Sequence, residues 1–441
     1  MAIRIGVEAA ECHALDFLLI HPRYPMPFWP IMPHGCLALA QYADMLGYQS
    51  ALWDYNMDPG ADDAALTRLL RSTRVRWVGI SLLSTQLPEA RRLARMIREA
   101  SPQTRIVAGG QHIAPSSAHT FPEADALVTG EGELALATIL SDDHATRPNG
   151  HGPSLNVISD ARLIHGDVIQ DINTIPLPDR SILARYASFA RFQRLGLLVA
   201  RGCPFDCTFC HFEERSREAR RYSPAAVGEL LTAAWEETGL DDVFFLDDIF
   251  TLSRQWVLDV CDEITRRGLT HLRYGCFSHV RVGSREIYEA MARAGFVQIQ
   301  LGIESGDERI RRRMHKNFSD EQTRAAVDLI KSCGMEPHCL FILGYTGETV
   351  DTMRRTLAMA ESLETTAWFS YAQPLPGTEF LVEAEGEGTI LERDLSKYGN
   401  QNIVYLPAGV TIEQMQQIQI EAEQLRQYLQ DRYAQGALTV V

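Results

Sequence analysis

The sequence lacks the features that mark several classes of protein. Acidic residues outnumber basic ones, 57 to 42, which gives a net charge of −15 and leaves no basic surface for a nucleic-acid backbone. No apolar run reaches the length of about 18 residues that predicts a membrane span. The N-terminal residues lack the basic segment and apolar core of a signal peptide. We therefore expect a cytoplasmic protein that neither binds nucleic acid nor spans a membrane.

Cysteines spaced as metal ligands are also few. Among nine cysteines only Cys203, Cys207 and Cys210 share one loop, directly after the apolar run 195–200, a predicted buried strand. Thiolates are the usual iron–sulfur ligands, and a 4Fe–4S cluster normally takes four of them, so this loop predicts a cluster with one open iron. A structural zinc site with His211 as fourth ligand is one alternative, although zinc sites usually pair Cys-x-x-Cys clusters. Three unrelated buried thiols are another.

The pattern Cys-x3-Cys-x-aromatic-Cys, with Phe209 in the aromatic place, resembles that of the radical SAM superfamily. The resemblance implies that S-adenosylmethionine (SAM) chelates the open iron through its amino and carboxylate groups. One electron, from a reducing partner such as flavodoxin or ferredoxin, would then cleave SAM to methionine and a 5′-deoxyadenosyl radical. The metal ligands would be Cys203, Cys207 and Cys210.

Downstream of the loop, predicted strands alternate with amphipathic helices. Strands at 243–246, 297–301 and 339–343 each end in polar or glycine residues, at the position where parallel barrels carry their active sites. Together with the resemblance, this order implies a partial (β/α)6 radical SAM barrel. The arginine-rich run 309–313 is expected to be a solvated helix face.

The resemblance also implies SAM contacts at the strand ends. Segment 302–306 resembles the fourth-strand motif whose glutamate approaches the ribose hydroxyls, and 344–348 resembles the turn on the adenine side. Asp247 and Asp248, after the second strand, would contact the amino group of the methionine part of SAM. Arg281, after the third strand, would contact its carboxylate. A helix N-cap or a salt bridge is the alternative role for each acid. The implied cofactor contacts are Phe209, Asp247, Asp248, Arg281, Glu304, Ser305, Gly344 and Glu348.

The first 150 residues predict a second α/β domain. Strands at 16–20, 49–53, 77–83, 105–110 and 125–130 alternate with helices, which indicates a doubly wound, Rossmann-like parallel sheet. Its ligand crevice should lie beyond the carboxyl ends of the strands. Since no Gly-x-Gly-x-x-Gly follows the first strand, a dinucleotide is not the expected ligand.

The ends of two of these strands, at 81–85 and 109–112, resemble the Ser-x-Leu and Gly-Gly elements of cobalamin-binding domains. The resemblance therefore implies cobalamin as a cofactor. The loop at 54–60 departs from the Asp-x-His-x-x-Gly motif and has Asn56 in the histidine's place, so no lower imidazole is expected and the cobalt's lower face should be open or water-bound. A degenerate flavodoxin-like domain that only docks substrate is the alternative. The implied contacts are Ser81, Leu83, Ser84, Gly109, Gly110, Gln111, Gly130 and Glu131.

These patterns predict a cobalamin-binding-like domain at 1–150, a linker at 151–191, a radical SAM barrel at 192–385 and a helical tail at 386–441. The expected function is a cobalamin-dependent radical SAM methyltransferase, a metal-binding enzyme that methylates an unactivated carbon of a natural product or pigment precursor. Aromatic residues at 368–371 suit a flat or apolar small-molecule substrate, although packing in the barrel wall is the commoner role of such residues. Cobalamin-assisted oxidation, cyclisation or ring rearrangement is the alternative chemistry, and a non-catalytic cofactor carrier the alternative of another class.

Overall fold

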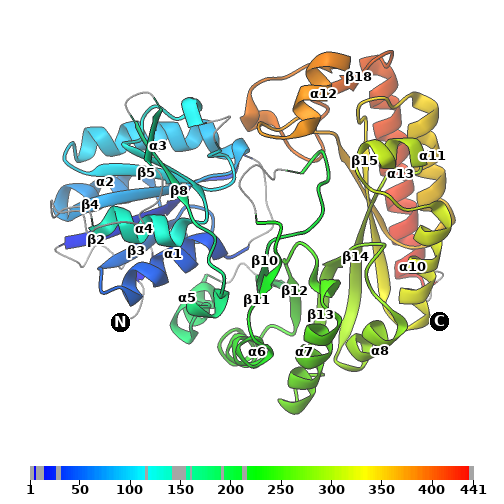
Figure 1. Ribbon diagram of the computed structural model, residues 1–441, viewed down its shortest axis with the longest axis horizontal. Helices are drawn as coiled ribbons and strands as arrows, with labels where there is room; N and C mark the ends of the chain where they lie inside the picture. The colour runs from blue at the N-terminus through cyan, green and yellow to red at the C-terminus, as the bar shows by residue number, and fades with distance from the viewer. Residues whose placement is uncertain are drawn as a thin grey trace. The chain divides into compact units, whose positions relative to one another are not determined.

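The computed structural model describes residues 4–5, 14–25, 31–114, 118–141, 155–158, 161–189, 193–210 and 216–436. The chain divides into two compact units (Figure 1). Unit 1 consists of residues 1–193 with 213–216 and 233–239, and unit 2 of the remaining residues from 194 to 441. In the described ranges, no helix combines the length and the apolar character needed to cross a membrane.

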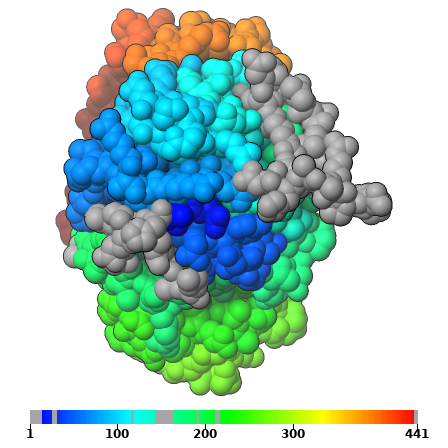
Figure 2. Space-filling view, turned by 90° about the vertical axis from the view of Figure 1, so that its left-hand side faces the viewer, coloured from blue at the N-terminus to red at the C-terminus, as the bar shows by residue number. Residues whose placement is uncertain are grey.

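Unit 1 is built on a sheet whose described strands run in the order β1-β3-β2-β4-β5-β6-β8-β7. Neighbours are parallel except β7 and β8. The strands are β1 (Arg4–Ile5), β2 (Ala14–His21), β3 (Ser50–Asp54), β4 (Arg74–Ser81), β5 (Arg105–Gly109), β6 (Ala126–Gly130), β7 (Leu155–Ile158) and β8 (Ala161–Gly166). The helices are α1 (His34–Met45), α2 (Asp63–Ser72), α3 (Leu87–Ala100), α4 (Gly132–Ser141) and α5 (Arg180–Ser188). Figure 2 shows the surface of this unit in blue and cyan.

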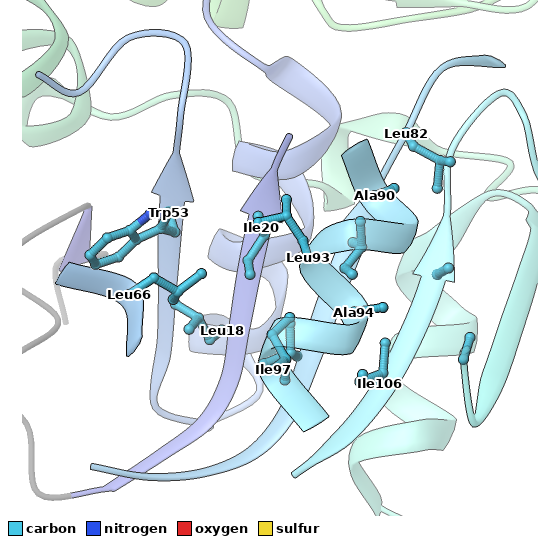
Figure 3. Packing of buried hydrophobic residues seen from close by; sticks show 14 of the residues in the cluster. Leu18, Ile20, Trp53, Leu66, Leu82, Ala90, Leu93, Ala94, Ile97 and Ile106 are labelled. Atoms are coloured by element: carbon cyan, nitrogen blue, oxygen red, sulfur yellow. The ribbon is translucent and has the colours of Figure 1, made fainter. Parts of the chain in front are cut away.

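Helices cover both faces of this sheet, with α2 and α3 on one side and α1 and α4 on the other (Figure 1). The strands are therefore apolar on both faces, and all of β3 is buried. Figure 3 shows the core beneath α3, where Leu93 and Ile97 pack against Ile20 and Ile106. The doubly wound sheet predicted from the sequence is confirmed.

The order of the strands reverses at β2. The chain passes from β2 to β3 on one side and then returns to β4 on the other side. The carboxyl ends of β2 and β4 therefore flank a topological switch point, where open α/β sheets bind their ligands.

The segment predicted as a linker carries regular structure. Its strands β7 and β8 form an antiparallel pair that extends the sheet beyond β6, and α5 follows. The proline-rich turn leads into α5, whose N-cap Asp179 accepts a hydrogen bond from the backbone N–H of Ile182 at 3.0 Å. The prolines of this turn therefore precede the start of a helix and do not belong to an irregular linker.

Unit 2 is a parallel sheet that curls into a half-barrel, with the described strands in the order β16-β15-β14-β13-β12-β9. The strands are β9 (Leu195–Leu197), β12 (Asp242–Phe245), β13 (Arg273–Ser278), β14 (Phe296–Glu304), β15 (Glu336–Leu343) and β16 (Ala367–Tyr371). The helices are α6 (Pro224–Thr238), α7 (Arg254–Arg266), α8 (Arg285–Arg293), α9 (Glu308–Arg313), α10 (Asp320–Ser332) and α11 (Val350–Ser362). A small antiparallel pair, β10 (Ala200–Arg201) and β11 (Arg220–Arg221), flanks the cysteine loop. The predicted partial barrel is confirmed.

The C-terminal residues are more than a helical tail. They form α12 (Glu379–Glu387), an antiparallel pair of β17 (Gly388–Ile390) and β18 (Tyr405–Pro407), and α13 (Ile412–Ala434). A capping box at Thr411 and Gln414 begins α13, which packs on α11 and β16.

Candidate functional site

The cysteine loop of unit 2 begins where β10 ends. Cys203 is buried, Cys207 and Cys210 are half-buried, and none of the three forms a disulfide with a described cysteine. The backbone N–H of Cys210 donates to the carbonyl of Cys207 at 3.0 Å, which turns the chain within the motif. Across the described residues no three acidic, histidine or cysteine side chains are already arranged as one set of metal ligands. His211 lies outside the described residues.

A buried ion pair lies beside this loop. Lys316 Nζ is 2.9 Å from Glu304 Oε1 and 5.9 Å from the centroid of the Phe209 ring. Burial alone would lower the pKa of Lys316, but Glu304 and the thiols of Cys207 and Cys210 outweigh it and raise this pKa. Burial raises the pKa of the Cys207 thiol, and the Lys316 ammonium opposes that shift. Sequence reasoning missed Lys316, whose signal was a lone lysine just after the basic run.

Glu304 reaches this pair through an irregular strand end. Its φ of 70° lies in the left-handed region, and the register between β14 and β15 shifts between Gly302 and Glu304. A bulge of this kind redirects side chains at the end of a strand, and non-glycine residues adopt such a φ at a cost. The next residue, Ser305, is fully buried and accepts a hydrogen bond from the backbone N–H of Asp307 at 3.1 Å.

The basic run after this strand is only partly a solvated face, which corrects the expectation from sequence. Arg311 is 0% exposed and donates to the carbonyl of Ser305 at 2.6 Å and to Asp320. Arg309 and Arg312 remain exposed. The fold buries Arg311 because its guanidinium ties the end of β14 to the start of α10.

The two acids after β12 have different surroundings. Asp247 is buried, and its Oδ1 accepts the backbone N–H groups of Val199 and Ala200 at 2.7 and 2.5 Å. Its Oδ2 is buried without a hydrogen-bond partner among the described residues, and burial raises the Asp247 pKa to about 7. Asp247 thus holds the segment that leads into the cysteine loop. Asp248 is half-buried and already interacts with other residues.

The turn after β15 is organised by its own glutamate. Glu348 Oε2 accepts the backbone N–H groups of Gly344 and Tyr345 at 2.7 and 3.0 Å. Its Oε1 is buried and has no hydrogen-bond partner in the described ranges, and burial raises the Glu348 pKa to about 8. Gly344 and Gly347 have φ values of 81° and 82°, which favour glycine at both bends.

Residues after β13 add a neutral imidazole and a free cation. His279 stacks on Phe205 of the cysteine loop with ring centroids 4.1 Å apart, and its Nδ1 accepts the backbone N–H of Arg281 at 3.1 Å. Burial, Lys316 and Arg281 lower the His279 pKa to about 3, so the ring stays neutral. The exposed guanidinium of Arg281 makes no ion pair with any described residue.

A polar chain connects the cysteine loop to α12. Thr208 Oγ1 is 2.6 Å from the Tyr345 hydroxyl, which donates to Glu383 Oε2 at 3.0 Å. The backbone N–H of Phe380 donates to the carbonyl of Thr208 at 2.9 Å, and the Phe380 ring stacks on Tyr345 at 4.5 Å. The sequence did not predict this tether, because its members are far apart in the chain. Tyr345 is 137 positions from Thr208 and 38 positions from Glu383.

In unit 1, the predicted cobalamin contacts gather at the carboxyl ends of β4, β5 and β6, which are adjacent strands. Gly110 has a φ of 100°, and a Cβ there would lie 2.7 Å from the carbonyl oxygen of Leu82, so the close approach of the two loops requires glycine. Exposed or half-buried positions at this edge are Ser81, Leu83, Gly109, Gly110, Gln111 and Gly130.

Two of the predicted contacts in unit 1 have partners within the fold. Ser84 is buried, and its Oγ is 3.1 Å from Nδ1 of His112. Glu131 accepts the backbone N–H of Ile169 at 2.9 Å, which ties the end of β6 to the segment after β8. Both residues support the edge of the sheet in the structure.

The fold brings a histidine to Asn56, although the loop at 54–60 contains none. His21 Nδ1 lies 3.2 Å from Asn56 Nδ2 and 3.0 Å from Asp54 Oδ1. Asn56 itself donates to the carbonyl of Pro22 at 2.8 Å and accepts the backbone N–H of Tyr24 at 3.0 Å. Asn56 is therefore engaged in joining two loops.

Family models match both units. The radical SAM superfamily model matches residues 197–360, and the B12 binding domain model matches residues 30–140. An uncharacterized methyltransferase of Pyrococcus horikoshii is 27% identical over 350 residues, covering 77% of this chain and 76% of that protein. The anaerobic magnesium-protoporphyrin IX monomethyl ester cyclase of Rubrivivax gelatinosus is 24% identical over 404 residues, covering 86% and 72%.

A solved structure shares the fold of nearly the whole chain. The radical SAM methyltransferase TsrM of Kitasatospora setae, with cobalamin and a 4Fe–4S cluster bound, superposes with a TM-score of 0.68 at 18% identity, covering 85% of this chain and 75% of that one. With tryptophan and a SAM analogue bound, it superposes with a TM-score of 0.73 at 17% identity, covering 94% and 89%. The match to the B12 binding domain precedes the match to the radical SAM superfamily in the chain. The chain therefore carries a B12 binding domain followed by a radical SAM domain, the combination on which cobalamin-dependent radical SAM enzymes are built.

Proposed function

We propose that the protein methylates an unactivated carbon of a small-molecule substrate, a natural product or pigment precursor, with cobalamin as the methyl carrier. The observation that carries this proposal is one chain with an open-iron cysteine loop and a B12 binding domain. Similarity to a methyltransferase over 77% of the chain supports it. The described cysteines form no disulfide with one another, which suits a reducing cytoplasm, and a donor such as flavodoxin or ferredoxin would supply electrons to the cluster.

The cluster would be held by Cys203, Cys207 and Cys210, whose chemistry fits three of its irons. When bound, the cluster and SAM supply a carbon radical, and cobalamin supplies the methyl group. The chain's own part is to hold the loop in place. Asp247 accepts a hydrogen bond from the backbone before the loop, and the Tyr345 hydroxyl contacts Thr208 within the loop.

The SAM site would be formed by groups around this loop. The exposed Arg281 guanidinium suits the methionine carboxylate, and Asp248 the amino group. Glu304, held by Lys316, would accept hydrogen bonds from the ribose hydroxyls. Glu348 and Gly344 would shape the adenine side, with Ser305 and Phe209 as supporting contacts.

The cobalamin site would lie at the carboxyl edge of the sheet in unit 1. Small side chains and glycines at the ends of β4, β5 and β6 leave the backbone there accessible to a large flat ligand. The proposed contacts are Ser81, Leu83, Ser84, Gly109, Gly110, Gln111, Gly130 and Glu131.

The test begins with anaerobic reconstitution and measurement of iron, sulfide and corrinoid per chain. Turnover with SAM carrying a deuterated methyl group should then yield both 5′-deoxyadenosine and S-adenosylhomocysteine, because a second SAM reloads the cobalt. The deuterated methyl should appear in the product. A chain that binds no corrinoid, or that transfers no methyl group to any accepted substrate, contradicts the proposal.

A second candidate is oxidative cyclisation of a pigment precursor. Similarity to a magnesium-protoporphyrin ester cyclase over 86% of the chain favours it. In that case the same assay should give 5′-deoxyadenosine without S-adenosylhomocysteine, and the product should have lost hydrogen instead of gaining a methyl group.

A further inference from the structure

The inner face of the half-barrel in unit 2 carries polar side chains. Along β14 and β15, fully buried residues such as Ile299 and Cys339 alternate with half-buried ones such as Gln300 and His338. Helices α8, α10 and α11 contact these strands, so the buried set faces the helices and the half-buried set lies on the opposite, inner face. Branched apolar residues usually fill the interior of a parallel barrel. Core packing therefore does not explain the polar residues here.

This inner face also carries the ion pair beside the cysteine loop. A Cβ on Gly302 would clash with Glu304 Oε1 and would lie 3.0 Å from Lys316 Nζ. Gln300 precedes Gly302 by two residues on the same face, and its register partner on β15 is His338. Two residues of a strand span about 7 Å. A molecule that touches Gln300 and His338 would therefore adjoin the groups proposed to hold SAM.

A buried carboxylate sets the tautomer of His338. Glu336 is 9% exposed and accepts the hydroxyl hydrogen of Thr366. Because a hydroxyl has only one hydrogen, Thr366 Oγ1 must accept from His338 Nδ1, which lies 2.7 Å away. Nδ1 therefore carries the ring hydrogen. Burial lowers the pKa of His338, which keeps the ring neutral and leaves Nε2 as a bare acceptor.

The same carboxylate orients the amide of Gln300. Glu336 Oε2 accepts Nε2 of Gln298 at 3.1 Å, so Oε1 of Gln298 is the acceptor atom of that amide. This oxygen accepts Arg194 Nη1 at 3.2 Å and Gln300 Nε2 at 3.4 Å. The hydroxyl of Tyr433 also donates to Glu336, and several donors around one carboxyl group are the pattern of an ionised carboxylate. The carbonyl oxygen of Gln300 is therefore left over.

The two acceptor atoms at the ends of this network are open. Neither His338 Nε2 nor Gln300 Oε1 has a hydrogen-bond partner among the described residues. Their strands lie about 4.8 Å apart, so one small ligand can reach both. Phe277, the register partner of Gln300 on β13, adds an aromatic side chain to the same face. Two neighbouring acceptors beside an aromatic ring suit a flat ligand that donates hydrogen bonds, and they repel the oxygens of an anion.

We propose that Gln300 and His338 form a subsite of hydrogen-bond acceptors that takes the N–H or O–H edge of a flat, largely apolar substrate. The substrate class is thus an N–H heteroaromatic compound or a phenol. Glu336 is a positioning residue, because it acts through Thr366 and Gln298. The inference rests on the proposed function only in that the molecule bound here is the one that is methylated.

The test uses nuclear magnetic resonance of the full apo chain with nitrogen-15-labelled histidine, without SAM or corrinoid. Proton–nitrogen correlation spectra should show the Nδ1–H tautomer for His338, whose signals are assigned by their loss in His338→Gln. Indole, used as the probe, should shift the Nε2 resonance upfield, because Nε2 accepts its N–H. N-methylindole and benzofuran have the same shape but no donor, so they should bind about 3- to 10-fold more weakly.

Replacement of Glu336 by Gln tests the positioning role. A glutamine amide can donate to Thr366, whose hydroxyl is then free to donate to His338 Nδ1. The ring should therefore change to the Nε2–H tautomer, and the preference for indole over N-methylindole should disappear. Glu361→Gln, at an exposed position of α11, is the matched control and should keep the native tautomer and the native preference. A native tautomer in Glu336→Gln would show that Glu336 does not set it.

Two results on the native chain would overturn the inference, so it does not depend on the folding of a variant. An Nε2–H tautomer would show that His338 presents no acceptor. Equal binding of indole and N-methylindole, or binding of neither, would show that no donor is recognised at this face. Both results leave the proposed function standing, because the test needs neither SAM nor cobalamin. Failure of methyl transfer overturns the proposed function alone, since the tautomer and the probe preference are measured without it.

Discussion

Replacement of Glu304 tests the ion pair beside the cysteine loop. Glu304 and Lys316 are both 9% exposed in their side chains and 2.9 Å apart. Glu304→Ala would leave the Lys316 ammonium buried without its carboxylate, and burial would then lower its pKa. Removing one partner of a buried pair costs about 3–5 kcal/mol of folding free energy.

The same change should weaken SAM binding. Loss of charge-assisted hydrogen bonds to the ribose hydroxyls costs about 1.5–3 kcal/mol, or about 10- to 150-fold in Kd. The two effects are separable. Glu304→Ala combined with Lys316→Met removes the stranded charge, so it should recover much of the lost stability while SAM affinity stays low.

Chemical unfolding of the apo chain measures the loss of folding free energy. Calorimetric titration of SAM into the cluster-loaded chain measures the loss of SAM affinity. Cluster content should remain intact in both variants, because neither residue ligates iron. If the double variant binds SAM as tightly as the native chain, Glu304 is only the structural partner of Lys316. If the Glu304→Ala variant unfolds at the same denaturant concentration as the native chain, the ion pair does not contribute to stability as a buried contact would.

Further predictions concern the cluster, the adenine-side turn and the cobalt. Replacement of any one cluster ligand by Ala should abolish both the reconstituted cluster and 5′-deoxyadenosine formation, so near-normal iron content in one of these variants would refute the assignment of Cys203, Cys207 or Cys210. The folded-state pKa of Glu348, about 8, lies above its ordinary value of 4.5, so its contribution to stability is full below pH 4.5 and is lost as the pH rises to 8. The free energy of unfolding of the apo chain should therefore fall across this pH range by an amount on the order of a few kcal/mol. Glu348→Gln should flatten this pH dependence. If the variant shows the same pH dependence as the native chain, Glu348 is ionised in the folded state. The cobalt(II) spectrum of the loaded chain should show no three-line nitrogen splitting, and such splitting would establish an axial imidazole.

Local patterns account for what the sequence predicted well. Spacing within a few residues defines the cysteine loop, and strand–helix alternation defines both sheets, because these signals need no knowledge of distant contacts. The partners of these groups could not be read in the same way. Lys316 meets Glu304 only through the bulge at the end of β14, and His21 meets Asn56 only because β2 and β3 are neighbours.

Burial was similarly hidden from the sequence. Arg311 sits in a run of arginines in which Arg309 and Arg312 are exposed, and its burial depends on its contact with Asp320 at the start of α10. The strands β7 and β8 were missed because the proline-rich turn after them dominates the composition of that segment.

The tether from Thr208 through Tyr345 to α12 has a consequence for fragments of this protein. Residues 379–387 lie beyond 197–360, the range that matches the radical SAM model. A fragment cut at residue 360 would keep the three cysteines proposed to hold the cluster and yet lose the backbone N–H of Phe380 and the carboxylate of Glu383 that restrain their loop. The smallest piece that keeps this loop restrained is therefore longer than the range that matches the radical SAM model, and fusions or circular permutations should leave residues up to the end of α12 in place.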